Sequence, residues 1–295
     1  VSTPEDQGLD PEVVKDLYCE ASLLDDIYSV LVIKNGYLVA EEYYNDGSID
    51  DRSNRQSVTK SFTSAFVGLA VEQGLVSVDQ KMVEFFPELE DDIDDNRKRD
   101  VTVEHLLQMR GGYPWEEEDY LDALFSQEYV RQIVDLPLTA DPGARFEYSN
   151  LSSHWLSVIV ERASGQQTRD FAQQHLFDAL GIQVGDWTED KDGYDYGFGE
   201  LGVRARDMAR FGQMVLDDGV VDGQPILPAA WVQASLASYS DDHDPLNRHR
   251  IGKNYENVGY GYQWWKVEAG DHRYDAALGH GGQQIVLLHD QDMVI

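Results

Sequence analysis

The β-rich segments of this chain lie at its two ends, and a long stretch with helical periodicity separates them. Residues 27–33 and 37–44 are rich in β-branched and aromatic side chains, and Asn35-Gly36 between them is the strongest short-range hairpin signal. The chain becomes β-like again near its end, at residues 260–267, 277–289 and 293–295. Strands from both ends bury their apolar faces most simply in one sheet. We therefore predict an α+β fold, in which an antiparallel β-sheet flanked by helices carries an inserted, mostly helical lobe.

The helical segments are marked by their end signals. Residues 10–24 have Asp10 as a plausible N-cap and Pro11 at the first helical position, and residues 57–73 end at Gly74. Further helices are expected at 103–109, at 151–164 before Gly165, at 169–180 before Gly181, and at 205–216. We predict a sheet domain from residues 1–60 and 195–295, a helical lobe from 61–194, and an active site between them.

Charge restricts the partners of this protein. It has 55 acidic and 23 basic residues, a formal net charge of −32, and only 8 lysines. Such a field repels nucleic acid and anionic membrane surfaces, so neither is an expected partner. An acidic, lysine-poor surface is similar to that of proteins from salt-accumulating halophiles, with an ordinary acidic soluble protein as the alternative.

No segment approaches the ~18 apolar residues of a membrane span. We expect a soluble protein and slightly favour the cytoplasm. Export stays open, because the sequence begins with Val1 rather than Met. Oligomeric state is also open.

Neither a disulfide nor a metal is expected. Cys19 is the single cysteine, and its helical surroundings predict a buried or half-buried structural thiol. Residues 188–200 nearly match a calcium loop, since Asp190, Asp192 and Gly193 are in register. Thr188 occupies the first ligand position, however, and the final Glu comes one place late. We interpret this stretch as a solvated loop, and we predict no cofactor.

The chain contains one Ser-x-x-Lys sequence, Ser57-Val58-Thr59-Lys60, at the start of a predicted helix. Lys60 then lies one turn from Ser57 on the same face, within reach of its hydroxyl. The helix N-terminus favours a developing alkoxide, and burial would lower the pKa of the lysine. The Gly-x-Ser-x-Gly elbow of α/β-hydrolases is absent. We predict Ser57 as a nucleophile and Lys60 as a catalytic group beside it.

A tyrosine that relays a proton is expected in a Tyr-x-Asn sequence, and three are present. Tyr43-Tyr44-Asn45 ends a predicted strand, and Tyr255-Glu256-Asn257 lies in a polar stretch. Tyr148-Ser149-Asn150 follows a Pro-Gly loop and precedes a helix, which suits presentation of side chains to a cleft. We favour Tyr148 and Asn150.

The third motif, after Ser-x-x-Lys and Tyr-x-Asn, is His280-Gly281-Gly282-Gln283, which we expect inside an apolar strand. Glycines within a strand mark a bulge or the close approach of another backbone or a ligand. Such a strand could supply the N–H of Gln283 as an oxyanion donor beside the N–H of Ser57. The alternative is an edge strand with an incidental histidine.

In this order and at these separations, the three motifs resemble those of class C β-lactamases and their relatives, which include DD-peptidases, esterases and nylon-oligomer hydrolases. The similarity extends over almost the whole chain, including residues 142–150, 205–212 and 259–264. It implies the β-lactamase/transpeptidase-like fold and an acyl-enzyme formed on Ser57. It also implies that Lys60 and Tyr148 share proton transfer, and that Asn150 contacts the substrate carbonyl side and orients Lys60.

Two departures from this family pattern matter. His280 stands where β-lactamases usually carry lysine, and a neutral imidazole is a poorer partner for an anionic antibiotic. We therefore predict a serine hydrolase of small esters or uncharged amides, with a β-lactamase or DD-peptidase as the alternative. In addition, relatives normally continue beyond the strand in which Ile295 lies.

An alternative of another class is a non-catalytic binding protein of the same fold. Loss of Ser57, Lys60 or Tyr148 would indicate it, and all three are present. Aromatic residues of the predicted lobe, which either line the cleft or belong to the core, are Tyr113, Trp115, Tyr120 and Phe125.

Overall fold

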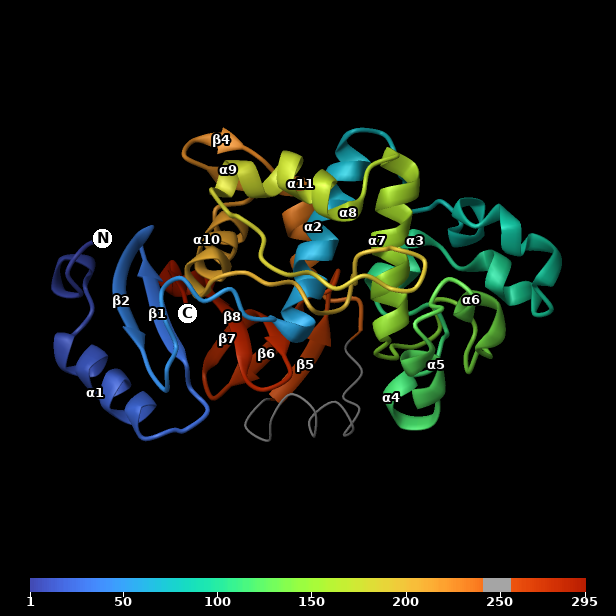
Figure 1. The fold of residues 1–295 in the computed structure, drawn as a ribbon. Coiled ribbons are helices and arrows are strands. Elements are labelled where there is room, and N and C mark those ends of the chain that lie inside the picture. The colour runs from blue at the N-terminus through green and yellow to red at the C-terminus, as the bar shows by residue number, and fades with distance from the viewer. Residues whose placement is uncertain (241–255) are drawn as a thin grey trace.

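Both ends of the chain contribute to one antiparallel sheet, as predicted. The computed structural model describes residues 1–240 and 256–295 (Figure 1). Seven strands lie in the order β2-β1-β9-β8-β7-β6-β5, so the first hairpin joins the last strands of the chain. Their bounds are β1 Ser29–Lys34, β2 Tyr37–Tyr43, β5 Glu256–Tyr260, β6 Trp265–Ala269, β7 His272–Gly279, β8 Gln283–Leu288 and β9 Met293–Val294.

The first hairpin turns at Asn35-Gly36. Both residues have positive φ, 52° and 76°, as a two-residue hairpin turn that matches strand twist requires. Neighbouring side chains of β1 point to opposite faces, so Val32 joins a cluster with helix α1 (Pro11–Ser22), whereas Ile33 joins the main core. Helix α10 (Ala205–Leu216) packs on β1, β8 and β9. Both faces of this part of the sheet are therefore covered.

The prediction of two long, unbroken strands at residues 260–267 and 277–289 was wrong. Residues 260–267 form the end of β5, a bend and the start of β6, and residues 277–289 are divided between β7 and β8. His280, Gly281 and Gly282 make the turn between β7 and β8, where Gly281 and Gly282 have φ of 79° and 86°. Glycines tolerate such left-handed backbone, so this pair turns the chain instead of interrupting a strand.

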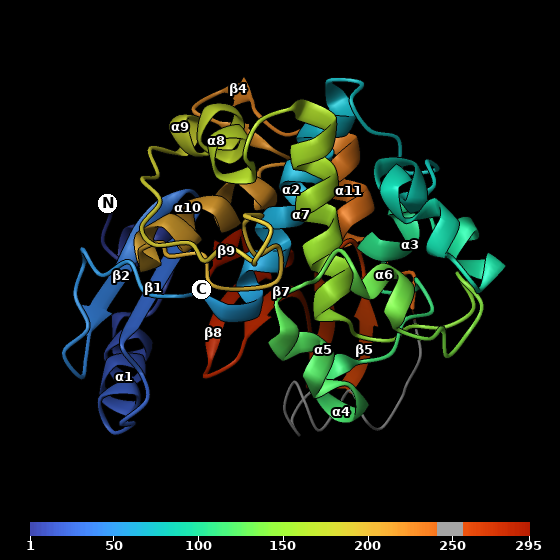
Figure 2. The ribbon, with the colours of Figure 1, turned by 45° about the vertical axis from the view of Figure 1, so that its right-hand side comes forward.

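Helix α2 (Thr59–Glu72) runs through the centre of the molecule beside α7 (Asn150–Ser164) (Figure 2). Every residue of α2 from Thr59 to Ala70 is buried, as in a helix covered on all sides. One continuous core includes Phe62 of α2, Trp155 of α7 and Ile285 of β8. Since this core joins the sheet to the helices, the division at residues 60/61 and 194/195 stays a prediction.

The remaining helices lie mostly between β2 and β5 in the chain. The expected helix ends at Gly165 and Gly181 are confirmed, since both glycines adopt left-handed C-caps. Their bounds are α3 Val103–Leu107, α4 Glu116–Asp119, α5 Leu121–Ser126, α6 Gln132–Asp135, α8 Thr168–Ala172, α9 Asp178–Leu180 and α11 Ala229–Leu236, with a π-helical segment Gln173–Phe177 between α8 and α9. Short 3₁₀ turns lie at Glu5–Gln7, Gln56–Val58, Met82–Phe85, Pro87–Asp92, Asn96–Asp100 and His289–Gln291, and a small hairpin pairs β3 Val220–Val221 with β4 Gln224–Pro225.

The structure tests the predicted burial of Cys19 and shows whether a described helix could span a membrane. Cys19 is exposed, so its prediction as a buried or half-buried thiol was wrong. Helix α1 buries Val14 and Ala21, and Cys19 lies off that face. Among the described residues, no helix is both long and apolar enough to span a membrane.

Candidate active site

Ser57 lies in a tight 3₁₀ turn (Gln56–Val58) immediately before α2, rather than in the α-helix itself. Gln56 has a φ of 49°, an uncommon value for a residue with a side chain. The side chain of Asn54 stabilises this turn, because its Oδ1 accepts hydrogen bonds from the N–H of Gln56 at 2.7 Å and of Glu200 at 3.1 Å. The nucleophile is thus presented by a constrained turn that is tied to a distant loop.

The amine of Lys60 is fully enclosed and contacts three polar groups. Its Nζ lies 2.8 Å from Ser57 Oγ, 2.8 Å from Asn150 Oδ1 and 3.0 Å from the carbonyl oxygen of Phe198. The predicted meeting of Ser57, Lys60 and Asn150 therefore occurs, although Lys60 and Asn150 are far apart in sequence. Burial lowers the pKa of Lys60 from 10.5 to about 7, and the nearby carboxylates of Glu117 and Glu116 offset part of that effect.

A buried carboxylate holds the start of α7. Glu116 accepts hydrogen bonds from the hydroxyl of Ser149 and from the backbone N–H groups of Asn150, at 3.0 Å, and Leu151, at 3.2 Å. Burial raises the pKa of Glu116 to about 7 against the lowering effect of these hydrogen bonds. The Ser149 hydroxyl also accepts a hydrogen bond from the N–H of Ser152 and so caps α7. Because Glu116 binds both this cap and the N–H of Asn150, the position of Asn150 depends on Glu116.

Tyr148 is surrounded by aromatic rings. It stacks on Trp265, with ring centroids 5.6 Å apart, and meets Trp115 and Tyr260 edge to face. Lys60 Nζ lies 4.9 Å from the centroid of the Tyr148 ring. The loop before α7 thus brings Tyr148 to the Ser57–Lys60 pair, as predicted.

Of the other two Tyr-x-Asn sequences, the structure describes the first in full and the second only in part. Asn45 follows β2 with a φ of 49°, and its side chain donates hydrogen bonds to the carbonyls of Leu24 and Ile27. Tyr255 lies outside the described residues.

An open pocket of about 510 Å³ lies at Ser57. Ser57, Tyr148, Asn150 and His280 all line it, and its other lining residues are Gln56, Trp115, Glu117, Leu124, Phe198, Gly199, Glu200, Trp265, Leu278 and Gly279. Trp115 is therefore the one of the four aromatic residues considered from the sequence that lines this pocket; Tyr113 is buried in the core and Phe125 is 74% exposed.

The close backbone approach expected of the glycine motif occurs at Gly279, one residue before it. A Cβ atom there would lie 2.7 Å from the carbonyl oxygen of Arg55 and 3.2 Å from the Cβ of Gln56. Any side chain would push the end of β7 away from the Ser57 turn. Gly279 thus allows β7 to form one wall of the pocket.

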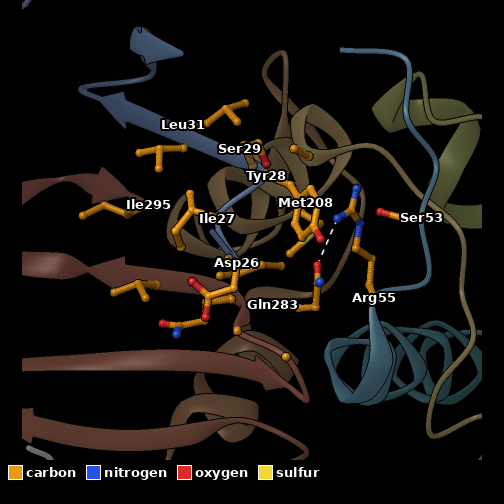
Figure 3. Close-up of a pocket in the computed structure, with 18 residues that line it drawn as sticks. Asp26, Ile27, Tyr28, Ser29, Leu31, Ser53, Arg55, Met208, Gln283 and Ile295 are labelled. Carbon is orange, nitrogen blue, oxygen red and sulfur yellow. Dashed lines mark hydrogen bonds between the residues drawn. The ribbon is translucent and has the colours of Figure 1, made fainter. Parts of the chain in front are cut away.

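Gly282 and Gln283 line a different hollow, of about 290 Å³, whose wall also includes Arg55 and Met208 (Figure 3). Gln283 begins β8 opposite Gly279, and its side-chain oxygen accepts a hydrogen bond from Arg55 Nη1 at 3.0 Å. Arg55 is buried and also donates to the carbonyl of Val203 at 2.7 Å. The structure therefore assigns Gln283 to the support of the segment before Ser57.

Sequence reasoning missed three groups that contact this site. The carbonyl of Phe198 is a backbone atom, and any residue type supplies it, so it has no sequence signal. Glu116 and Glu117 belong to a run of four acidic residues in an acidic chain, where nothing distinguishes one carboxylate from another. The hydrogen bond from Asn150 Nδ2 to Glu117, at 2.9 Å, is what places Glu117 beside the site.

In the stretch that nearly matches a calcium loop, the carboxylate of Asp190 makes hydrogen bonds within the protein. Asp190 is buried and lies 2.9 Å from His154 Nε2, and it accepts hydrogen bonds from the N–H groups of Asp192 and Tyr194. In the two described ranges, no three His, Cys, Asp or Glu side chains are grouped so as to hold a metal ion.

A Ser-Lys pair, a tyrosine loop and a β-strand wall around one pocket define a serine hydrolase of the β-lactamase fold. The chain belongs to the Beta-lactamase family, whose sequence profile matches residues 28–295. The resemblance inferred from the three motifs is thereby confirmed.

Two of the similar proteins are named as a hydrolase and an esterase. The chain is 27% identical over 296 residues to the 6-aminohexanoate-dimer hydrolase of Paenarthrobacter ureafaciens, covering 94% of this chain and 73% of that protein. It is 28% identical over 156 residues to the lovastatin esterase of Penicillium rubens, covering 45% of this chain and 39% of that one. The octameric penicillin-binding protein homologue of Pyrococcus abyssi shares the fold, with a TM-score of 0.74, 20% identity and coverage of 97% and 72%.

Proposed function

We propose that this chain hydrolyses small esters or uncharged amides through a covalent acyl-enzyme on Ser57. The observation that carries the proposal is the enclosure of Lys60 Nζ, 2.8 Å from Ser57 Oγ and within 3.0 Å of two further oxygen atoms. The similarity to a hydrolase of an amide dimer and to an esterase supports the same class of reaction.

The contacts of Lys60 suit a neutral amine. Asn150 Oδ1 and the Phe198 carbonyl can only accept hydrogen bonds, so they occupy the two N–H donors of a neutral amine. The remaining lone pair then faces Ser57 Oγ and can accept its proton. With a pKa lowered to about 7, Lys60 is neutral in a large share of molecules at pH 7.

The reaction would proceed in two stages. Ser57 Oγ attacks the carbonyl carbon while its proton passes to Lys60, and the oxyanion is bound by the N–H of Ser57 and by a backbone N–H at the end of β7, near Gly279. Tyr148 donates its hydroxyl proton to the departing alcohol or amine and takes up the proton held by Lys60, and the group leaves as the carbonyl re-forms. Water then attacks the acyl-enzyme by the same route in reverse and releases the acid and free Ser57.

The pocket favours substrates without a carboxylate. Its lining contains Glu117, Glu200 and His280, and neither lysine nor arginine belongs to the wall that the described residues form. A β-lactam carboxylate would meet two like charges there, which is unfavourable. Ester or amide hydrolysis is therefore preferred over the action of a β-lactamase or DD-peptidase, and the presence of Ser57, Lys60 and Tyr148 disfavours a non-catalytic binding protein.

Parallel labelling tests this proposal. We expect a fluorophosphonate to modify Ser57 stoichiometrically, as mapped by peptide mass spectrometry, and p-nitrophenyl butyrate to be hydrolysed, whereas a fluorescent penicillin labels poorly and nitrocefin is turned over slowly if at all. Modification of another residue would refute Ser57 as the nucleophile. Rapid nitrocefin turnover at several salt concentrations would instead establish the β-lactamase alternative.

The pH dependence of hydrolysis follows from the pKa of Lys60. A base acts in its neutral form, so kcat/KM for an uncharged ester is expected to rise about tenfold per pH unit below pH 7 and to level off above it. Because Glu117 favours the charged form of Lys60, Glu117→Gln should move this limb to lower pH. A profile that is flat between pH 5.5 and 8 would contradict the assignment of Lys60 as the base.

A further inference from the structure

We propose that the pocket selects substrates carrying an ammonium group near the scissile ester or amide, and that Glu117 and Glu200 bind this cation. The inference rests on the proposed function, since it concerns the substrate of the Ser57 nucleophile. It goes beyond that function by adding a positive charge, outside the bond that is broken, as the feature the pocket recognises.

The two carboxylates that line the pocket have no lysine or arginine beside them in the described lining. Glu117 and Glu200 both line the pocket. Glu117 belongs to α4, and Glu200 follows Phe198 in a distant loop. The pocket wall formed by residues 1–240 and 256–295 contains no arginine or lysine side chain. A substrate cation would therefore find two carboxylates and no competing cation in the lining.

Both residues are attached to the catalytic framework, Glu117 through its carboxylate and Glu200 through its backbone. Glu117 accepts a hydrogen bond at 2.9 Å from the side chain of Asn150, which itself contacts Lys60. The backbone of Glu200 has a φ of 66°, and its N–H donates to Asn54 Oδ1, the same atom that supports the Ser57 turn. Since the Glu117 carboxylate and the Glu200 backbone are held in place before binding, these parts need little ordering when a cation arrives.

Aromatic rings form the remaining walls and suit an ammonium group. Trp115, Tyr148, Phe198 and Trp265 all line the pocket. The Nζ of Lys60 lies 4.9 Å from the centroid of Tyr148 and 5.7 Å from that of Phe198, so these rings already lie close to an amine nitrogen. Carboxylates combined with aromatic faces are the chemistry that recognises alkylammonium ions.

The overall charge of −32 also attracts cations, so the local effect must be separated from it. The long-range field is screened at 1 M salt, where the Debye length is about 3 Å, whereas contacts within a pocket are screened less. Assays at 1 M salt therefore measure mainly recognition by the pocket.

Isosteric substrates provide the test. The first pair is a p-nitrophenyl alkanoate that ends in trimethylammonium and the same ester ending in tert-butyl, which differ in charge but not in shape. The second pair, acetylthiocholine and dimethylbutyl thioacetate, places the charge on the leaving side. We expect kcat/KM to favour the cation by about tenfold or more in at least one pair, and a p-nitrophenyl monoester of a dicarboxylic acid to be the poorest substrate.

Glutamine substitutions then locate the recognition. In the preferred pair, Glu117→Gln and Glu200→Gln are each expected to reduce the cation-to-neutral ratio by about threefold to tenfold, because each removes one carboxylate at close range. The ratio cancels changes common to both substrates, including any shift in the pKa of Lys60. Asp119→Asn, on the same helix as Glu117 but outside the pocket lining, removes equal charge and should leave the ratio unchanged.

The outcomes separate this inference from the proposed function. If neither pair favours the cation while the neutral esters are hydrolysed, the ammonium site is refuted and the hydrolase is not. A ratio that falls equally in Asp119→Asn would attribute the preference to the general field and would also refute the site. If no ester of any charge is hydrolysed, the proposed function itself fails.

Discussion

Ser57→Ala is expected to abolish ester hydrolysis, lowering kcat/KM for p-nitrophenyl butyrate by a factor of about 10⁴ or more. Of the three oxygen atoms that the described residues place within 3.0 Å of Lys60 Nζ, the variant lacks the one that can become acylated, because the other two belong to an amide side chain and a backbone carbonyl. Fluorophosphonate labelling should be lost together with turnover.

Two controls test whether a loss of activity comes from the missing nucleophile rather than from substitution in this segment or from unfolding. Ser53→Ala, four residues earlier and lining the other hollow, is the matched control and should retain activity. The thermal unfolding temperature of Ser57→Ala should stay close to that of the unmodified protein, since Ser57 lines the pocket and does not belong to the hydrophobic core. Turnover that survives in Ser57→Ala would rule out this nucleophile.

Lys60→Met is expected to lower kcat by a factor of about 10³, with a smaller change in KM. Methionine fills a similar buried volume but cannot accept the proton of Ser57, and it leaves Asn150 Oδ1 and the Phe198 carbonyl without this donor. Lys60→Arg should be similarly inactive, since a guanidinium stays protonated at all assay pH values.

Kinetics with p-nitrophenyl butyrate at pH 7 and pH 9 will check this expectation. If Lys60 acts as the base, raising the pH should restore little activity to either variant, because neither carries a group that becomes a base there. Activity of Lys60→Met within tenfold of the unmodified protein would assign the proton transfer to another group, with Tyr148 as the nearest candidate on the described geometry.

Local sequence signals predicted the elements well where a single residue decides the backbone. Asn35-Gly36 determined the first hairpin, and Gly165 and Gly181 ended their helices, because each requires a φ that other residues avoid. The same reasoning failed at His280-Gly281-Gly282. There the glycines were interpreted as a strand interruption, although two consecutive left-handed glycines equally make a turn. Cys19 was misplaced because helical periodicity alone did not fix which face of α1 is buried.

The sequence by itself therefore determined the fold class and the family, and it predicted Ser57, Lys60, Tyr148 and Asn150 as site residues, since side-chain type, order and spacing are written along the chain. Only the tertiary structure decided the surroundings that tune them: the Phe198 carbonyl on Lys60, Glu116 behind Asn150, Glu117 and Glu200 in the pocket wall, and Gly279 rather than Gln283 beside Ser57. The physical reason is that these contacts join distant segments through backbone atoms or through acids that are chemically alike. Their roles depend on burial and on distances of about 3 Å, which a linear pattern does not encode.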